Sequence, residues 1–344
     1  MTEPSQPDLS EALDTVERYL LGDTPSLTRV EVCERAGVPI EVAEELWRLL
    51  GFPHQPDDAV AFTEADVQAL EYTHDLVGLG ILSPDRQAAL VRTWGRSFAR
   101  LAEWQTTLLT DVALESPDPV AQVTDLASEV LPRVEALQAY VWRRHLASAG
   151  NRLMASDSAG SDTSRLAVVF VDIVGFTSRS KELTEAELVR WIEYFEAECS
   201  GLVVDHGGRV IKNIGDEVLF VAEDVARAAD AALTMTARGA DAEDGFPEVR
   251  AGLAYGDVVS RLGDVFGPTV NIAARLTSIA RPGSVLIDRG AHDALTGDST
   301  DEDQDEREHG DFSLRRMRRT SVKGYARLQS WVLRRSKRGW SAGR

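Results

Sequence analysis

The spacing of apolar residues changes near the middle of the chain, and this change limits what the chain can fold into. Up to residue 146 apolar side chains recur every three or four residues, the period of an amphipathic helix. From residue 165 short apolar runs alternate with helical stretches. Between them, residues 147–164 are dense in Ser, Gly, Ala and Asp, as in a linker or a frayed helix end. We predict an all-helical domain (1–146), a linker (147–164), a second domain (165–335) and a basic tail (336–344).

The helical half contains the outline of a helix-turn-helix unit. SLTRVEVCERAGVPIEVAEELWRLLGF is typical of a helix, a turn with glycine and a second helix, and its order resembles the start of MerR-type DNA-binding domains. A DNA-reading helix needs side chains that contact bases and neutralise phosphates. This second helix offers Glu41, Glu44 and Glu45 with only Arg48. We therefore expect a packed helical module and no nucleic-acid partner.

The net charge excludes a protein that wraps a polyanion. The chain has 56 acidic and 37 basic residues, a formal net charge of −19. Residues 1–150 contain 25 acids, 11 arginines and no lysine, a net of −14, so most of the acidity belongs to the helical half.

Several further features predict a cytoplasmic protein. The longest apolar run, Leu166 to Val171, is far below the roughly 18–20 residues of a membrane span. The start, MTEPSQPDLSE, has neither the basic region nor the apolar core of a signal peptide. Cys33 and Cys199 stand alone, which excludes a disulfide framework or a zinc cluster and fits a reducing compartment.

The second half predicts an α+β fold. LAVVFVDIVGFT is a near-continuous apolar run, as in a buried strand that ends in an Asp and a Gly turn. RVIKNIGDEVLFVAE gives two β-rich runs joined at Gly215-Asp216, a hairpin signal. Helices and further strands alternate after it. We predict a ferredoxin-like, split βαβ arrangement with a largely antiparallel sheet.

Two carboxylates lie where buried strands end. Asp172 follows the first strand, and Asp216 lies in the hairpin turn. In a ferredoxin-like sheet the first strand neighbours such a hairpin, so both carboxylates are expected to face one site and to hold hard divalent cations. Two-metal sites of this kind assist displacement at phosphorus.

Three segments resemble the catalytic domain of class III adenylate cyclases: FVDIVGFT, IKNIGDEVLF and GDVFGPTVNIAARLTS, in the order of that family. The resemblance covers about residues 165–335. It implies that ATP is converted to 3′,5′-cyclic AMP and pyrophosphate. It also implies two Mg²⁺ or Mn²⁺ ions per site, held by Asp172, Asp216 and the backbone carbonyl of Ile173.

The same resemblance implies the other site residues. Lys212 and Asp264 match the pair that reads adenine, and this favours ATP over GTP because a lysine donor and a carboxylate acceptor complement adenine. Asn271 and Arg275 match residues that orient the ribose and stabilise the transition state; four residues apart on a helix, they share one face. Lys323, in SVKGY, matches a lysine that contacts the terminal phosphates.

In this family each site forms between two catalytic domains. Because this chain carries both sets of residues, the resemblance implies a head-to-tail homodimer with two equivalent sites. Other readings are a diguanylate cyclase, whose hairpin reads Gly-Gly-Asp-Glu rather than Ile-Gly-Asp-Glu, a catalytically silent nucleotide sensor, and a transcription regulator with a cyclase-like ligand domain.

The helical half is similar to N-terminal autoinhibitory domains of actinobacterial cyclases. A response to protons is plausible with 25 acids and with His54, His74 and His145. Apolar stripes such as Leu90 to Trp104 are expected to form core or a dimer seam, or to line a lipid pocket.

In the second half, residues 298–309 carry seven acids and one arginine. We expect a solvated loop there, just before the strand region of Lys323, with pairing to the basic tail as the weaker alternative.

Overall fold

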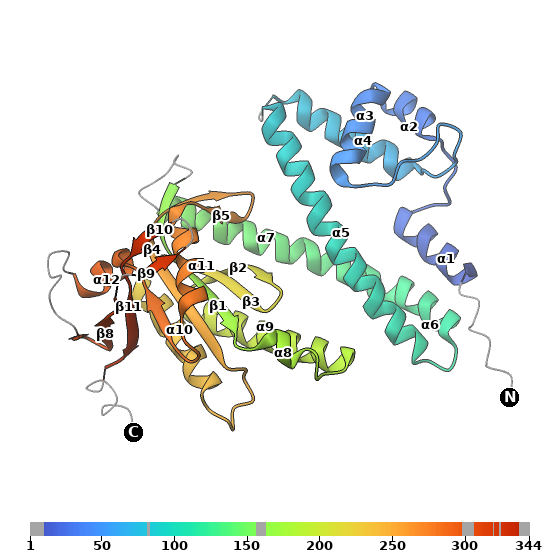
Figure 1. Cartoon of the computed structure of the whole chain (residues 1–344). Helices are drawn as coiled ribbons and strands as arrows, with labels where there is room; N and C mark the ends of the chain where they lie inside the picture. The colour runs from blue at the N-terminus through green and yellow to red at the C-terminus, as the bar shows by residue number, and fades with distance from the viewer. Residues whose placement is uncertain are drawn as a thin grey trace. The chain divides into compact units, whose positions relative to one another are not determined.

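The computed structural model describes residues 10–80, 83–155, 163–297, 306–318, 320–322 and 325–336 of the 344-residue chain. The chain divides into two compact units, residues 1–156 and 157–344, and Figure 1 shows the helices and strands of each. Within the described part of the chain, no helix has the length and apolar character needed to cross a bilayer.

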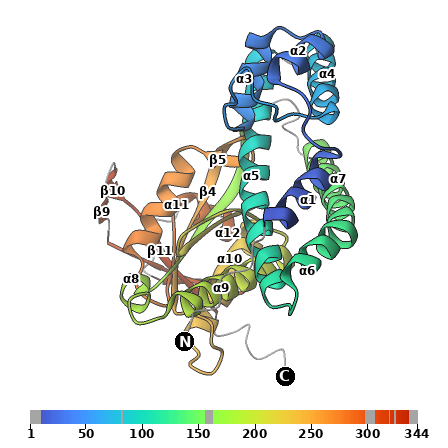
Figure 2. The same ribbon diagram turned by 90° about the vertical axis from the view of Figure 1, so that its right-hand side faces the viewer.

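The first unit is all helical. Its helices are α1 (Ser10–Leu21), α2 (Arg29–Ala36), α3 (Ile40–Leu50), α4 (Glu64–Gly78), α5 (Pro84–Leu114), α6 (Pro119–Asp125), a π-helical turn (Leu126–Val130) and α7 (Leu131–Ala155). Helices α2, α3 and α4 gather around the first half of the long α5, as two views show (Figures 1 and 2). The helical expectation for this half is confirmed.

Helices α2 and α3 form the expected helix-turn-helix. Thr28 and Glu31 make a reciprocal capping box that starts α2, and Gly37, with φ of 66°, ends it in the left-handed conformation. Behind the two helices, Leu27 and Phe62 form an isolated β-bridge that closes the loop after α3.

Among the described residues, the aromatic stripe on α5 is not buried in a core. Trp94, Phe98 and Trp104 are 40 %, 58 % and 57 % exposed. A stripe with helical spacing shows only that one face is apolar, and another chain or a ligand can cover that face as well as the chain itself. Of the uses predicted for the stripe, burial in the core is therefore wrong.

The boundary region also differs from the sequence prediction. Helix α7 continues to Ala155, and the first strand begins at Thr163. The two ends of the segment 147–164, which we expected to be a linker, therefore belong to a helix and a strand. The good helix formers Ala, Leu, Met and Arg in residues 147–155 outweigh the single Gly150.

The second unit is built on one large sheet. Its helices are α8 (Phe176–Arg179), α9 (Glu185–Asp205), α10 (Val225–Gly239), α11 (Pro268–Ile279) and α12 (Arg289–Thr296). Its strands are β1 (Thr163–Ile173), β2 (Arg209–Ile214), β3 (Glu217–Ala222), β4 (Val249–Arg261), β5 (Asp264–Phe266), β6 (Val285–Ile287), β7 (Glu306–His309), β8 (Phe312–Arg316), β9 (Thr320–Val322), β10 (Tyr325–Leu328) and β11 (Trp331–Arg335).

The strand order confirms the predicted α+β, ferredoxin-like class. The main sheet runs β2-β3-β1-β4-β6-β11-β8-β7, with β5 paired to β4, and β9 and β10 form a separate hairpin. The first four of these strands have the split βαβ order, because β1, α9, β2 and then β3, α10, β4 follow one another along the chain. Neighbours are antiparallel except β4 and β6, which are parallel.

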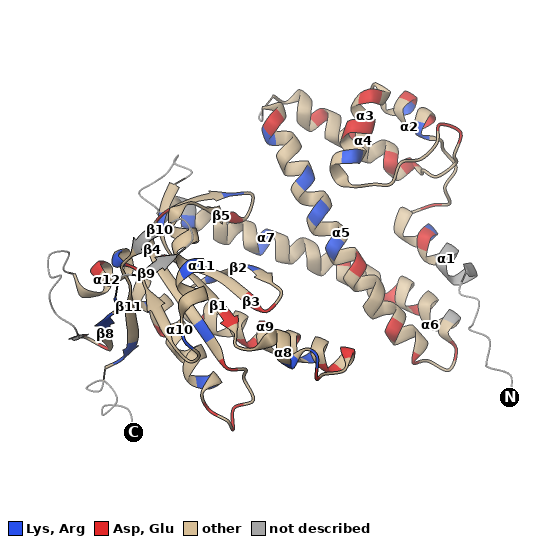
Figure 3. Cartoon of the chain, in the orientation of Figure 1, with Lys and Arg blue, Asp and Glu red and all other residues tan. Residues whose placement is uncertain are grey.

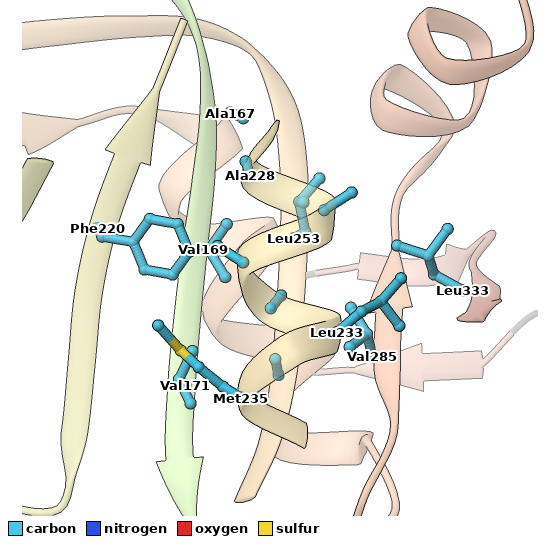
Figure 4. Close-up of a cluster of buried hydrophobic side chains, with 14 of the residues drawn as sticks. Ala167, Val169, Val171, Phe220, Ala228, Leu233, Met235, Leu253, Val285 and Leu333 are labelled. Atoms are coloured by element: carbon cyan, nitrogen blue, oxygen red, sulfur yellow. The ribbon is translucent and has the colours of Figure 1, made fainter. Parts of the chain in front are cut away.

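Strand β1 is buried on both faces, which explains its near-continuous apolar sequence. Val169 and Val171 pack with residues of α9 and α10 in the largest core cluster (Figure 4). Val168 and Phe170 point to the other face, where they pack with Ala273 of α11. Gly252 of β4 lets α11 approach closely, since a Cβ there would lie 2.4 Å from the Ala273 carbonyl oxygen.

The acidic stretch 298–309 is partly structured, contrary to the loop prediction. Residues 306–309 form β7, an edge strand that pairs antiparallel with β8. The charged residues that argued against a strand are typical of sheet edges, where they oppose pairing with other chains. Residues 298–305, the other part of the predicted loop, lie outside the described residues.

Candidate active site

The register of β1 with its two neighbouring strands places Asp172 between two charged residues. Asp172 lies opposite Glu217 of β3 on one side and opposite Arg250 of β4 on the other. Side chains alternate along a strand, so Asp172 shares the face of Val168 and Phe170, the face that α11 covers. The Asp172 side chain is only 15 % exposed.

Arg250 holds one oxygen of Asp172. Its Nε and Nη2 atoms both lie 2.7 Å from Asp172 Oδ2. Its Nη1 donates to the carbonyl oxygen of Ser278, near the end of α11, at 3.4 Å. The guanidinium group therefore fixes the orientation of the carboxylate, and its contacts leave Oδ1 of Asp172 free of Arg250.

The β2–β3 hairpin brings Asp216 to the same end of the sheet. Gly215, with φ of 65°, supplies the left-handed residue of the two-residue turn. The carbonyl oxygen of Asp216 accepts a hydrogen bond of 3.1 Å from the Ile173 N–H. This bond joins the turn to the last residue of β1, next to Asp172.

The carboxylates at this edge repel one another. Burial raises the pKa of Asp216, and the charge of Asp172 raises it further, while Arg250 opposes the shift. Burial and the charges of Asp172 and Asp216 raise the pKa of Glu217 to about 7. A cation beside these groups would relieve this repulsion.

The residues fit a divalent ion that arrives with its substrate. Among the described residues no three His, Cys, Asp or Glu side chains are grouped so that they could hold a metal ion. Mg²⁺ is usually held in proteins by one or two carboxylates together with substrate phosphates and water. Asp172 and Asp216 supply two such carboxylates, and Ile173, which follows Asp172, donates its N–H to the carbonyl oxygen of Asp216.

The structure brings together the two residues matched to adenine recognition. Lys212 of β2 and Asp264 of β5 are 52 positions apart in the sequence, yet Lys212 Nζ lies 2.5 Å from Asp264 Oδ2. Both side chains are partly exposed, 43 % for Lys212 and 29 % for Asp264, so a ligand can reach the pair. The other Asp264 oxygen accepts the Val265 N–H at 2.8 Å.

Helix α11 presents Asn271 and Arg275 one turn apart. Pro268 begins the helix at its first position, where a missing N–H costs nothing. Asn271 is exposed and Arg275 is half-buried. Nothing in the described part of the chain makes a hydrogen bond or ion pair with either side chain, so both are left for a ligand.

The candidate residues thus form three pairs. No hydrogen bond or ion pair joins the carboxylates Asp172 and Asp216, the pair on β2 and β5, and the pair on α11 to one another within the described residues. Lys323 lies outside the described residues.

Sequence reasoning missed Arg250 and Glu217. Both left a signal: Arg250 interrupts the apolar strand VRAGLAYG, and Glu217 follows Asp216 directly in the hairpin. A buried strand tolerates an arginine only with a partner, and the register of β1 and β4 supplies Asp172 as that partner.

Comparison with known proteins gives matches over both units. A family model described as "Adenylate and Guanylate cyclase catalytic domain" matches residues 160–335, and one described as "Adenylate cyclase regulatory domain" matches residues 6–140.

Curated relatives match across both units as well. An adenylate cyclase from Streptomyces coelicolor is 41 % identical over 79 % of this chain and 72 % of its own length. One from Glutamicibacter nicotianae is 35 % identical over 93 % of this chain and 81 % of its own length. A protein named pH-sensitive adenylate cyclase from Mycobacterium tuberculosis is 31 % identical over 83 % of this chain and 74 % of its own length.

Proposed function

Because the chain belongs to the class III adenylate cyclases, we propose that it converts ATP into 3′,5′-cyclic AMP and pyrophosphate in a head-to-tail homodimer whose activity the helical unit controls. In this reaction the ribose 3′-oxygen bonds to the α-phosphorus, the bond from that phosphorus to the pyrophosphate oxygen breaks, and the 3′-hydroxyl proton leaves. Divalent cations, when bound, polarise the phosphate oxygens and lower the pKa of the 3′-hydroxyl.

The residues of the first pair position and neutralise charge. Asp172 and Asp216 would hold the cations, and Arg250 keeps Asp172 oriented through the two 2.7 Å contacts. The positive charge of Arg250 also lies where a triphosphate would add negative charge.

The observation that carries the choice of ATP is the 2.5 Å contact between Lys212 Nζ and Asp264 Oδ2. A lysine donates to a ring nitrogen, and a carboxylate accepts from the exocyclic amino group of adenine. Guanine offers a carbonyl oxygen at the position of that amino group, so the Asp264 carboxylate would face a second acceptor without a proton between them. The pair therefore favours adenine and rejects guanine.

A specificity variant tests this assignment. We expect the wild-type chain to turn over ATP at least about tenfold faster than GTP, since an unpaired buried acceptor costs about 1–3 kcal/mol. Replacing both residues, Lys212→Glu with Asp264→Cys, should remove most of the ATP turnover and the preference. Initial rates with each nucleotide measure the effect, and Arg190→Gln, on the exposed face of α9, serves as a control. If the double variant preferred ATP over GTP as strongly as the wild type does, the assignment would be contradicted.

Shared sites in a dimer explain why the three pairs are not joined in one chain. The Asn271 and Arg275 side chains have no partner among the described residues. Apolar residues at the ends of the same sheet are exposed: Ile214 by 47 %, Leu262 by 54 % and Phe266 by 51 %. Leu262 also has a positive φ of 54° in the turn between β4 and β5, where glycine or asparagine is usual. A second copy placed head to tail would cover these side chains and complete both sites.

The helical unit supports regulation by protons or by a lipid. His54 Nδ1 lies 3.4 Å from Arg29 Nη1, and Arg29 pairs with Glu44 at 2.6 Å and Asp57 at 2.5 Å. The His54 ring therefore lies in direct contact with this network of charges. A hollow of about 810 Å³ between α5 and α7 is lined largely by apolar side chains, including Phe98, Trp104 and Trp142, and has the character of a lipid site.

The proton response is tested in the full chain. We expect the activity of the wild type to change across roughly pH 5.5 to 8, and His54→Gln to flatten this profile because the ring then cannot gain charge. His309→Gln, an exposed residue of β7 outside the helical unit, is the control. The proposal fails if His54→Gln keeps the wild-type profile, or if removing residues 1–150 leaves the profile unchanged.

A further inference from the structure

A second hollow in the helical unit is lined by positive charge. It has a volume of about 390 Å³ and lies between the last turn of α3 and the first half of α5. Arg48 contributes from α3, and Arg92 and Arg96 contribute from α5. None of the described residues that line it is acidic. This contrasts with the unit as a whole, whose first 150 residues carry a net charge of −14.

A close helix contact builds this hollow. Gly95 of α5 lies against the end of α3, and a Cβ at this position would lie 2.3 Å from the Leu50 carbonyl oxygen. Glycine therefore lets the two backbones touch. The contact fixes the spacing between Arg48 and the two arginines of α5, which lie on either side of Gly95.

Arg92 and Arg96 of α5 have no carboxylate partner in the part of the chain that the structure describes. Elsewhere in the unit Arg29 pairs with Glu44 and Asp57, and Arg35 pairs with Glu64 at 2.9 Å. Arg92 and Arg96 form no ion pair or hydrogen bond with any residue that the structure describes. They lie four residues apart on one helix face, where like charges repel. Figure 3 shows positive residues spaced along α5.

The remaining charges near the hollow do not cancel the positive charge of its three arginines. Arg48 has Glu45 as a partner at 3.8 Å, with 77 % and 64 % of the two side chains exposed. The end of α3 adds about half a negative charge through its dipole, against three guanidinium groups. Gly51 caps that end by donating its N–H to the carbonyls of Trp47 and Arg48.

We propose that this hollow binds a small phosphate-bearing anion. Planar guanidinium groups donate pairs of hydrogen bonds to phosphate oxygens, and three of them around one compact hollow match a multiply charged group. A long alkyl chain fits the apolar lining of the other hollow, not this one. Bound here, the anion would tie the helix-turn-helix to α5 through Arg48, Arg92 and Arg96.

The test follows amide hydrogen exchange in the full-length chain with inorganic pyrophosphate as the probe. A chelator removes the divalent cations that would help to hold pyrophosphate at the catalytic site, and the readout reports on each peptide segment separately. We expect pyrophosphate to slow exchange in residues 48–51 and 92–99. The variant R92Q/R96Q should bind pyrophosphate at least about tenfold more weakly, as judged from the concentration needed to slow exchange. Each hydrogen bond to a charged group contributes about a factor of ten in affinity.

The control R86Q/R100Q removes the same charge from α5 at two positions that do not line the hollow, and it should respond as the wild type does. The proposal is overturned if pyrophosphate leaves exchange in both segments unchanged, or if both double variants respond alike. It is also overturned if R92Q/R96Q changes the sedimentation mass of the protein, since the arginines would then belong to a contact between copies.

Discussion

Replacing Asp172 with asparagine should lower the ATP turnover about 10³-fold, because a metal ion contributes several kcal/mol to such a reaction and each ~1.4 kcal/mol is a factor of ten. Asparagine keeps the shape of the side chain but loses the charge that pairs with Arg250 and that we propose to hold a cation. The same change removes the charge that raises the pKa of Asp216 and Glu217, so both values should fall toward their ordinary range.

Two measurements separate a loss of metal from a loss of fold. Mn²⁺ binding, followed by spin resonance with an ATP analogue that cannot cyclise, should weaken in Asp172→Asn. Thermal unfolding should remain cooperative. The matched control is Asp205→Asn, which removes an exposed carboxylate at the end of α9 and should leave turnover and Mn²⁺ binding intact. Normal Mn²⁺ binding in Asp172→Asn would contradict the assignment.

Replacing Arg275 with alanine should lower kcat about 10³-fold, the low end of the range for an arginine that stabilises the transition state of phosphoryl transfer. Arg275 lies one turn from Asn271 and has no partner among the described residues, so its charge is free for the α-phosphate. An interaction made only in the transition state lowers kcat and kcat/KM together and leaves KM nearly unchanged.

The control for Arg275 is Arg281→Ala, an exposed arginine just after α11. It removes the same charge and should keep kcat within about twofold, as surface changes usually do. A large rise in KM for ATP with kcat unchanged in Arg275→Ala would show a role in ground-state binding and would contradict a transition-state role.

The sequence predicted the fold well where pattern and environment agree. The run Leu166–Val171 is apolar because both faces of β1 are covered, and the Gly215-Asp216 turn follows from the need for a positive φ. Only the resemblance points to Lys212 and Asp264 as the pair proposed to read adenine, because each residue has an ordinary interpretation when taken alone.

The rest depended on long-range contacts. Arg250 joins Asp172 only through the β1–β4 register, which no local pattern specifies. The exposure of Trp104 depends on what covers α5, and the spacing of apolar residues along the helix does not indicate what that is. The extension of α7 to Ala155 and the strand at residues 306–309 reflect propensity and edge pairing that composition alone hides.

We propose that each active site takes residues from two copies of the chain. Asp172→Ala and Arg275→Ala chains, each inactive alone, should regain activity when co-expressed in equal amounts. Random pairing makes half of the dimers mixed, and each mixed dimer has one intact site, so about a quarter of the wild-type rate is expected. Initial rates of cyclic AMP formation by the purified mixture measure it. No recovery, despite mixed dimers shown by two affinity tags, would contradict the shared site.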